Sequence, residues 1–417
     1  MRFPEIDYDT HPAYSPFRTA TIYDEDFLAQ QVRTADLAYS AFCSIAEPTQ
    51  TAADQALQQI RESADRFVLH ARRQNMPAIA EEWLHSCARW TVNDVAYELA
   101  RRVLSARQHR STALSPVHAE QLSAMQTRGM YVCALPSDAY GEIRRLSLTF
   151  LDQLKQQAAK NPSERAVTSV KYNSPLWRAI KSAARQAGIF DVLGELKKNR
   201  MTMLGAGLEY SSSEQNWHQN IYADVGLSES PFQYLHFDEG YSIPKAMIYV
   251  TPVTDANGPT RAIPGSNCWE ASEFRQRMHR ALDRMVGDRY GSLGSAGNYR
   301  PLARRSELRR IFMQLPAAVR GSSHFGDDVL PGTAAAEALS GQEIQYLSDG
   351  AQAFVFDGPH LLHRGSIVHD GERLALQVAF RNKNEAIIRA NLANETFVRE
   401  QLALGRKYAR KFVMAYL

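Results

Sequence analysis

Two histidines and one aspartate in the second half of the sequence have the types and spacing of a metal site. His236 and Asp238 are one residue apart in the run LHFDEG, and none of the other eleven histidines is followed two positions later by aspartate. On a β-strand both side chains would point to the same face, because strand side chains alternate. With a distant second histidine, such a pair forms a two-histidine, one-carboxylate set that leaves three coordination positions open and suits non-haem Fe(II).

The elements that must hold these residues change along the chain. Residues 52–72 and 77–107 have apolar residues at three- and four-residue steps, which predicts amphipathic helices and a helical N-terminal region over 1–115. Further helices are expected over 139–160, 175–198 and 270–312, and strands, several with alternating apolar residues, at 130–135, 201–207, 232–237, 245–253, 352–357 and 373–381. Helices followed by a strand-rich part predict an α+β protein with a sandwich or barrel at its centre.

The surroundings of His236 and Asp238 add specificity to a pair that is weak alone. They are followed by NGPTRAIPGSN at 257–267, by FDGPHLLHRGS at 356–366 and by GERLALQVAFR at 371–381. This ordered set, within residues 120–385, resembles the phytanoyl-CoA dioxygenase (PhyH) family of Fe(II)- and 2-oxoglutarate-dependent oxygenases. The resemblance implies a double-stranded β-helix (jelly-roll, cupin-like) core over 116–390, flanked by helices. Two departures are Asn267, where the family turn ends in histidine, and a long segment 270–345, expected as a helical insertion or lid. A C-terminal helix is expected over 391–417.

The resemblance also implies roles for individual residues. His236, Asp238 and His363 match the family's iron ligands; His363 precedes Arg364-Gly365-Ser366 and lies ten residues before Arg373. His360 remains an alternative distal ligand. His218, in NWHQN, lacks the carboxylate partner because Asn220 stands there, and it is interpreted as structural or pocket-lining.

The cosubstrate site follows from the same resemblance. Arg373 matches the arginine that binds the distal carboxylate of 2-oxoglutarate, a role that suits the planar fork of a guanidinium. Lys245 and Tyr249 alternate onto one face of the preceding strand and are weaker candidates for cosubstrate contact. With O2, such an enzyme decarboxylates 2-oxoglutarate to succinate and CO2 and oxidises its substrate. Because Asp238 keeps the carboxylate that halogenating relatives lack, hydroxylation, desaturation or cyclisation is favoured.

The substrate is expected to be a small molecule, and an anionic one is a hypothesis. Residues 270–310 contain ten arginines against five acidic residues, which is typical of solvated helices but also compatible with attraction of an anion. Arg304 and Arg305 in this segment, and Arg261 in the PTRAIPGS turn, are the candidate substrate contacts. The alternative function is a metal-binding protein on the same scaffold that does not use 2-oxoglutarate, such as a sensor or an isomerase.

Composition restricts the other function classes. Lys+Arg 48 against Asp+Glu 45 gives a net charge of +3, which does not favour nucleic-acid or membrane binding. Four scattered cysteines without a C-x-x-C pair indicate reduced thiols. No signal peptide and no long apolar run is found, so a cytoplasmic location is expected. Nucleotide-binding, zincin and nucleophile-elbow motifs are missing, and the oligomeric state, a homodimer among the options, is left open.

Overall fold

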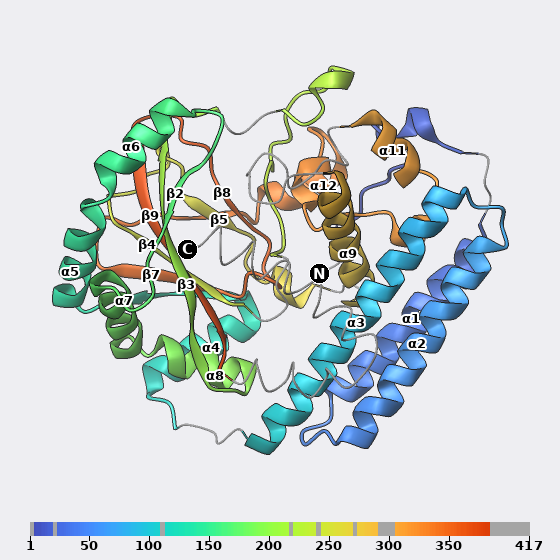
Figure 1. Cartoon of the computed structure of the whole chain (residues 1–417), viewed down its shortest axis with the longest axis horizontal. Helices are drawn as coiled ribbons and strands as arrows, with labels where there is room; N and C mark the ends of the chain where they lie inside the picture. Colours follow the sequence, from blue (N-terminus) through green and yellow to red (C-terminus); the bar gives the residue numbers. More distant parts are fainter. Residues whose placement is uncertain are drawn as a thin grey trace.

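The computed structural model describes residues 4–19, 23–108, 113–216, 220–238, 243–269, 273–290 and 305–383. Long helices occupy one side of the molecule and two β-sheets with their covering helices occupy the other (Figure 1). Helices α9 and α12 lie between them, and α11 lies near the upper ends of the long helices. The α+β class predicted from the sequence is therefore confirmed as a mixed helical and antiparallel-sheet structure.

The helical side is built from α1 (Glu25–Cys43), α2 (Gln50–Arg72) and α3 (Ala78–Gln108). The first two begin at residues whose side chains cap the helix: Asp24 accepts a hydrogen bond from the backbone N–H of Phe27, and Thr49 accepts one from Ala52. The helices expected at 52–72 and 77–107 are thus confirmed. Their apolar faces form one buried cluster that also contains residues of α9 (Glu273–Tyr290) and α11 (Ser306–Phe312).

The strands form a six-stranded sheet, ordered β1-β7-β4-β9-β3-β2, and a three-stranded sheet, ordered β6-β5-β8. All strand pairs in both sheets are antiparallel. Their bounds are β1 Met130–Ala134, β2 Ala166–Ser169, β3 Met201–Ser212, β4 Lys245–Tyr249, β5 Thr260–Ala262, β6 Ile344–Tyr346, β7 Gln352–Phe356, β8 His363–Gly365 and β9 Glu372–Asn382.

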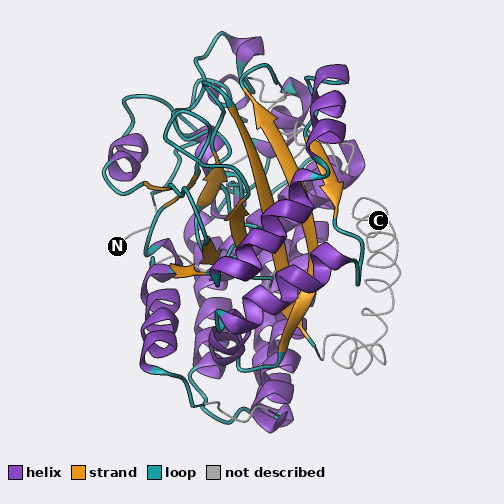
Figure 2. Cartoon of the chain, turned by 90° about the vertical axis from the view of Figure 1, so that its left-hand side faces the viewer, coloured by secondary structure: helices purple, strands orange, loops and turns teal. Residues whose placement is uncertain are grey.

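The two faces of the large sheet have different neighbours. On β4, Ala246 and Ile248 belong to the cluster formed with the covering helices, whereas Tyr249 belongs to a separate cluster that also contains Ala262 of the small sheet. The covering helices lie across the strands (Figure 2). They are α4 (Pro116–Arg128), α5 (Ser137–Leu148), α6 (Leu151–Lys160), α7 (Pro175–Gln186) and α8 (Ile189–Lys197). The inner face, which carries Lys245 and Tyr249, is thereby directed at the small sheet.

The segment after β5 contains α9, α11 and α12 (Ala334–Ser340). Helix α9 packs mainly on α3 and also on α1, so it joins the segment predicted as a lid to the N-terminal helices. The division of the chain into two domains at residue 115 stays a prediction. Apolar residues from both sides of this position belong to one buried cluster. Short 3-10 helices occur at Ser15–Phe17, Ala223–Val225, Ser266–Cys268, Ala317–Val319 and Phe325–Asp328. The expected helix at 391–417 lies outside the described residues.

Three predicted elements differ from the structure. The helix expected over 139–160 is two helices, α5 and α6, and that over 175–198 is interrupted at Gly188, whose φ of 68° is left-handed. Residues 232–237 do not form the expected strand. Tyr234 has φ 64°, a conformation that a strand does not contain, and His236 forms only an isolated bridge with His363.

The four cysteines are free, as the sequence predicted. Within the described part of the chain, no helix combines the length and apolar character needed to cross a membrane.

Candidate metal centre

His236, Asp238 and His363 converge on one point between the two sheets. One ligand atom from each lies within 4.8 Å of the other two. Oδ1 of Asp238 is 3.6 Å from Nε2 of His236 and 3.7 Å from Nε2 of His363. Ligands at right angles around a metal, with bonds of about 2.1 Å, stand about 3 Å apart. A small inward movement of these side chains would therefore complete one face of an octahedral site.

Both imidazole rings are oriented by backbone carbonyls. Nδ1 of His236 lies 2.7 Å from the carbonyl oxygen of Tyr234, and Nδ1 of His363 lies 2.9 Å from that of Leu361. A carbonyl only accepts hydrogen bonds, so Nδ1 carries the proton in each ring and Nε2 presents its lone pair. Burial lowers the pKa of His363 to about 3, which keeps that ring neutral at neutral pH.

Asp238 provides the negative charge. Burial raises the pKa of Asp238, but the positive charge of Lys245 and contacts with the two histidines outweigh it and hold the pKa well below its ordinary value. Nζ of Lys245 donates to Oδ1 at 2.7 Å. Oδ2 is buried and has no hydrogen-bond partner among the described residues. A buried, ionised oxygen without a donor is costly, and a bound cation would remove that cost, so the residues present fit a metal.

Irregular backbone, and not a regular sheet, positions the first two ligands. His236 exchanges both backbone hydrogen bonds with His363, at 3.0 and 3.1 Å, and the N–H of Asp238 donates to the carbonyl of Gly358 at 3.0 Å. The left-handed conformation of Tyr234 is held by Asp327, whose Oδ1 accepts from the Tyr234 N–H at 2.6 Å. Strain of this kind persists where surrounding contacts fix it.

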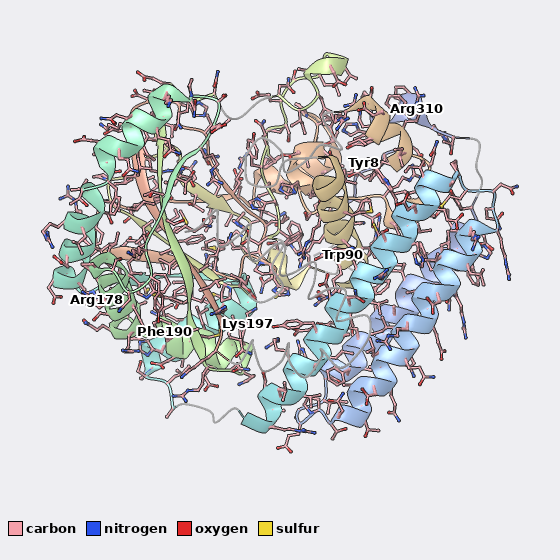
Figure 3. The ribbon with its side chains drawn as sticks, viewed as in Figure 1. Tyr8, Trp90, Arg178, Phe190, Lys197 and Arg310 are labelled. Carbon is pink, nitrogen blue, oxygen red and sulfur yellow. The ribbon has the colours of Figure 1, made fainter. Side chains whose placement is uncertain are left out.

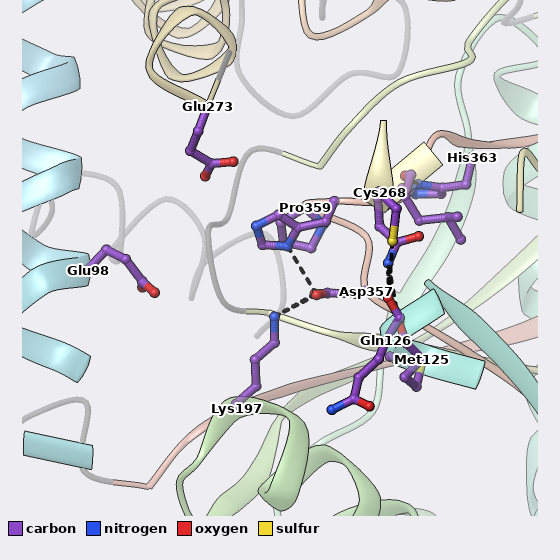
Figure 4. A network of polar contacts seen from close by, with 12 residues as sticks. Glu98, Met125, Gln126, Lys197, Cys268, Glu273, Asp357, Pro359 and His363 are labelled. Carbon is purple, nitrogen blue, oxygen red and sulfur yellow. Dashed lines mark hydrogen bonds and ion pairs between the residues drawn. The ribbon is translucent and has the colours of Figure 1, made fainter. Parts of the chain in front are cut away.

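The segment before His363 contains a buried ion pair. Nζ of Lys197, at the end of α8, donates to both carboxylate oxygens of Asp357 at 2.8 and 2.7 Å (Figure 4). Nδ1 of His360 lies 3.0 Å from Oδ2 of Asp357. Burial raises the pKa of Asp357, but Lys197 and His360 hold it below its ordinary value. The structure therefore gathers His363 with His236 and Asp238, and directs Nδ1 of the alternative ligand His360 to a carboxylate.

Arg373 is buried on β9, on the same face as Ala375 of the inner cluster. Its guanidinium donates to the carbonyl of Gly258 and, at 3.2 Å, to Oγ of Ser211, and it lies 3.8 Å from the carboxylate of Glu209. Nε has no partner among the described residues. The positively charged guanidinium of Arg373 is thus buried on the face of β9 that is directed at the small sheet.

The two weaker cosubstrate candidates also face that space. The Tyr249 hydroxyl is 3.0 Å from Oγ1 of Thr260 and accepts a hydrogen bond from the Thr260 N–H at 2.6 Å. Burial raises the pKa of Tyr249, and the charge of Arg373 opposes the rise, which places the two side chains within electrostatic reach. Lys245 instead contacts the candidate ligand Asp238.

The two described candidate substrate arginines, Arg261 and Arg305, have partners away from the candidate ligands. Arg261 alternates with inward-facing Thr260 and forms an ion pair with Glu343 at 3.1 Å. Arg305 pairs with Glu307 at 2.7 Å beside α11. Arg304 and His218 lie outside the described residues. Other arginines of 273–310 make structural contacts that include Arg275 to Glu5, Arg277 to Glu273, Arg284 over Trp90 and Arg309 to Asp224.

Several residues near the candidate metal centre were not predicted from the sequence. His324 lies with its ring parallel to that of His236, the centroids 5.2 Å apart, and Gly358 touches Asp238. Asp327 and Lys197 support the ligand segments from distant parts of the chain. Of these four residues, only Gly358 lies in one of the family-like motifs, FDGPHLLHRGS at 356–366.

Fold and site together define a class: a mixed helical and antiparallel-sheet protein with a buried two-histidine, one-carboxylate centre between its sheets. The sequence profile of the family described as phytanoyl-CoA dioxygenase (PhyH) matches residues 46–373. The chain belongs to this family.

Solved structures show weaker similarity. EctD from S. alaskensis with bound Fe is 14% identical, with a TM-score of 0.37, and covers 66% of this chain and 80% of its own. HygX from Streptomyces hygroscopicus with nickel and 2-oxoglutarate bound is 12% identical, with a TM-score of 0.33, and covers 65% and 88%. The non-heme alpha ketoglutarate dependent epimerase SnoN from nogalamycin biosynthesis is 9% identical, with a TM-score of 0.34, and covers 64% and 83%. No curated protein matches the chain.

Proposed function

We propose that this protein is an Fe(II)- and 2-oxoglutarate-dependent oxygenase that oxidises a small molecule. The observation that carries the proposal is the convergence of one ligand atom each from His236, Asp238 and His363, all within 4.8 Å of one another. Membership of the PhyH family supports the same chemistry. In this proposal the two sheets are the halves of a double-stranded β-helix within residues 116–390.

The chain's own residues would prepare the metal and its ligands. Neutral imidazoles and one ionised carboxylate leave Fe(II) with one net positive charge and three open positions. When bound, iron with 2-oxoglutarate and O2 supplies the oxidising power and releases succinate and CO2. The carbonyls of Tyr234 and Leu361 hold the imidazole rings in the ligating tautomer. Burial of Asp238 and His363 keeps bulk water from these ligands.

Arg373 would bind the distal carboxylate of 2-oxoglutarate. Its guanidinium is buried on the inner face of β9, and a buried guanidinium gains most from a bidentate carboxylate partner. The Tyr249 hydroxyl and Thr260 hydroxyl, which contact one another, would add hydrogen bonds to that carboxylate. Lys245, beside Asp238, would be directed at the metal end of the cosubstrate.

An anaerobic titration tests this proposal. Fe(II) and 2-oxoglutarate together should produce a weak visible charge-transfer band, and oxygen should then release succinate slowly even without a substrate. Asp238→Ala should abolish both signals, because a ligand is lost. His360→Ala is the matched control, since His360 lies three residues from His363 but its Nδ1 contacts Asp357. If the wild-type protein gives neither band nor succinate, the oxygenase proposal is wrong, and a sensor or isomerase remains.

A further inference from the structure

Helix α9 connects the N-terminal helices to the segments that carry the candidate metal ligands. Its apolar residues, Phe274, Met278, Leu282, Met285 and Val286, belong to the buried cluster of the N-terminal helices. Two charged residues of α9 that lie one turn apart, Arg280 and Asp283, contact the segments near the candidate metal ligands. Residues three apart share a helix face, so a single face of α9 makes both contacts.

Asp283 holds residues 322–328, which we call the backing segment. Oδ2 of Asp283 accepts hydrogen bonds from Oγ of Ser322 at 2.8 Å and from the N–H and Oγ of Ser323, both at 2.6 Å. His324 follows, with Nδ1 3.8 Å from the same oxygen. All four residues are buried. Three donors on one buried carboxylate oxygen fix the start of the backing segment relative to α9.

The backing segment in turn shapes the turn that carries His236. The N–H of Phe237 donates to the carbonyl of Ser323 at 2.9 Å, and the N–H of Gly326 donates to the carbonyl of Leu235 at 2.9 Å. The His324 ring lies parallel to that of His236, with an interplanar angle of 8°. Because residues 232–237 are not part of a regular strand, these contacts replace the missing hydrogen-bond ladder.

Arg280 reaches both ligand segments. Its guanidinium donates to the carbonyl of Pro359, four residues before His363, and lies 5.5 Å from the ring centroid of Phe237, between His236 and Asp238. The same side chain is buried. One cation therefore joins the segment of the distal histidine to that of the first two ligands.

We infer that α9 is a brace that sets the geometry of the metal centre, with Asp283 and Arg280 as positioning residues. This inference rests on the proposed metal-binding function. The N-terminal helices contribute to the centre through α9, because their apolar cluster holds the opposite face of this helix. Outer residues that orient metal ligands affect metal affinity about 10- to 100-fold, and we expect effects of this size.

The test compares Asp283→Asn, Arg280→Met and a control on the same helix, Arg284→Met, in the full chain. Arg284 lies over Trp90, its guanidinium carbon 4.6 Å from the ring centroid, and Figure 3 shows Trp90 on α3. Loss of this side chain therefore loosens the packing of α9 on α3. Co(II) is the probe: its visible spectrum reports ligand geometry and its titration reports affinity. Both positioning variants should bind Co(II) about 10- to 100-fold more weakly, with altered spectra, while Arg284→Met keeps the wild-type spectrum and affinity.

The outcomes separate this inference from the proposed function. Wild-type affinity and spectrum in both Asp283→Asn and Arg280→Met would overturn the brace, while leaving the metal site in place. Equal weakening in the Arg284→Met control would also overturn it, since general loosening would then explain the loss. Ser323→Ala is a milder variant for the case in which Asp283→Asn fails to fold, and it should shift the spectrum in the same direction. Absence of Co(II) binding by the wild-type protein would reject the metal site itself.

Discussion

Gly358 offers a direct test of the geometry around Asp238. A Cβ atom added at this position would lie 1.9 Å from Oδ2 and 2.8 Å from Cγ of Asp238. The backbone of Gly358 is not left-handed, so alanine introduces no backbone strain. Gly358→Ala therefore acts through one steric contact, against a side chain proposed to bind iron.

The size of the effect follows from how tightly Asp238 is held. The 1.9 Å contact is about 1.1 Å shorter than the 3.0 Å below which something must shift. Nζ of Lys245 restrains the carboxylate of Asp238 through a hydrogen bond of 2.7 Å to Oδ1. The backbone N–H of Asp238 donates to the carbonyl of Gly358 itself. To relieve the overlap with Oδ2, the carboxylate must move, and the position of Oδ1 relative to the two histidines then changes. We expect metal binding to weaken about 10- to 100-fold, or by about 1.4–2.8 kcal/mol.

Co(II) titration of the purified protein measures this change. Gly365→Ala is the matched control, because it lies two residues after His363 and a Cβ there would meet nothing within 4 Å. The overpacked variant should also lose about 1–3 kcal/mol of unfolding free energy without metal, measured by urea denaturation. If Gly358→Ala binds Co(II) with the affinity of Gly365→Ala, the described contact between Gly358 and Asp238 is wrong.

Three further changes have expected outcomes. Burial lowers the pKa of His279 to about 3 from 6.5, so the unfolded chain protonates first as pH falls; at pH 5 this costs about 2 kcal/mol of stability. Denaturation curves between pH 7 and pH 5 should show a smaller loss for His279→Gln than for the wild type, and equal losses would contradict the buried neutral ring. Lys197→Met leaves Asp357 buried without its cation and should cost about 3–5 kcal/mol, whereas adding Asp357→Asn should recover part of this in urea melts. Arg373→Lys should weaken 2-oxoglutarate binding at least about tenfold, through the lost bidentate fork; calorimetry with unchanged affinity would exclude Arg373 as the anchor.

Periodicity predicted much of the fold. The apolar spacing of α2 was sufficient because this helix buries one face, and local pattern reports such burial directly. Helix α3 packs on both α2 and α9, and its apolar residues still recur at three- and four-residue steps. The pattern at 232–237 failed, although Phe232, Leu235 and Phe237 are all buried. Their burial comes from a turn held by Asp327 and Gly326, and contacts from residues about ninety positions away leave no trace in a local period.

The candidate ligands illustrate a prediction that rests on a partly incorrect premise. His236 and Asp238 were expected to share a face because they lie on a strand, but the structure provides only an isolated bridge at His236. They still converge, since the backbone N–H of His236 donates to the carbonyl of His363 and that of Asp238 donates to the carbonyl of Gly358. The i, i+2 spacing therefore identified the pair, whereas the supports of the pair required three-dimensional information.

The charge pattern of the arginine-rich segment, residues 270–310, could not be interpreted from the sequence alone either. Its charge pattern suggested attraction of an anion, but Arg277 and Arg309 are buried in ion pairs with Glu273 and Asp224. Arginine suits such sites because its fork satisfies several acceptors at once and its aliphatic part packs against apolar surface. Burial of these charges is costly unless each is paired. Arg277 also donates to the hydroxyl of Tyr39 on α1, and Arg309 pairs with Asp224, so these contacts help to specify how α9 and α11 sit against their neighbours. The described arginines of α9 and α11 therefore have structural partners, whereas the attraction of an anionic substrate by this segment stays a prediction.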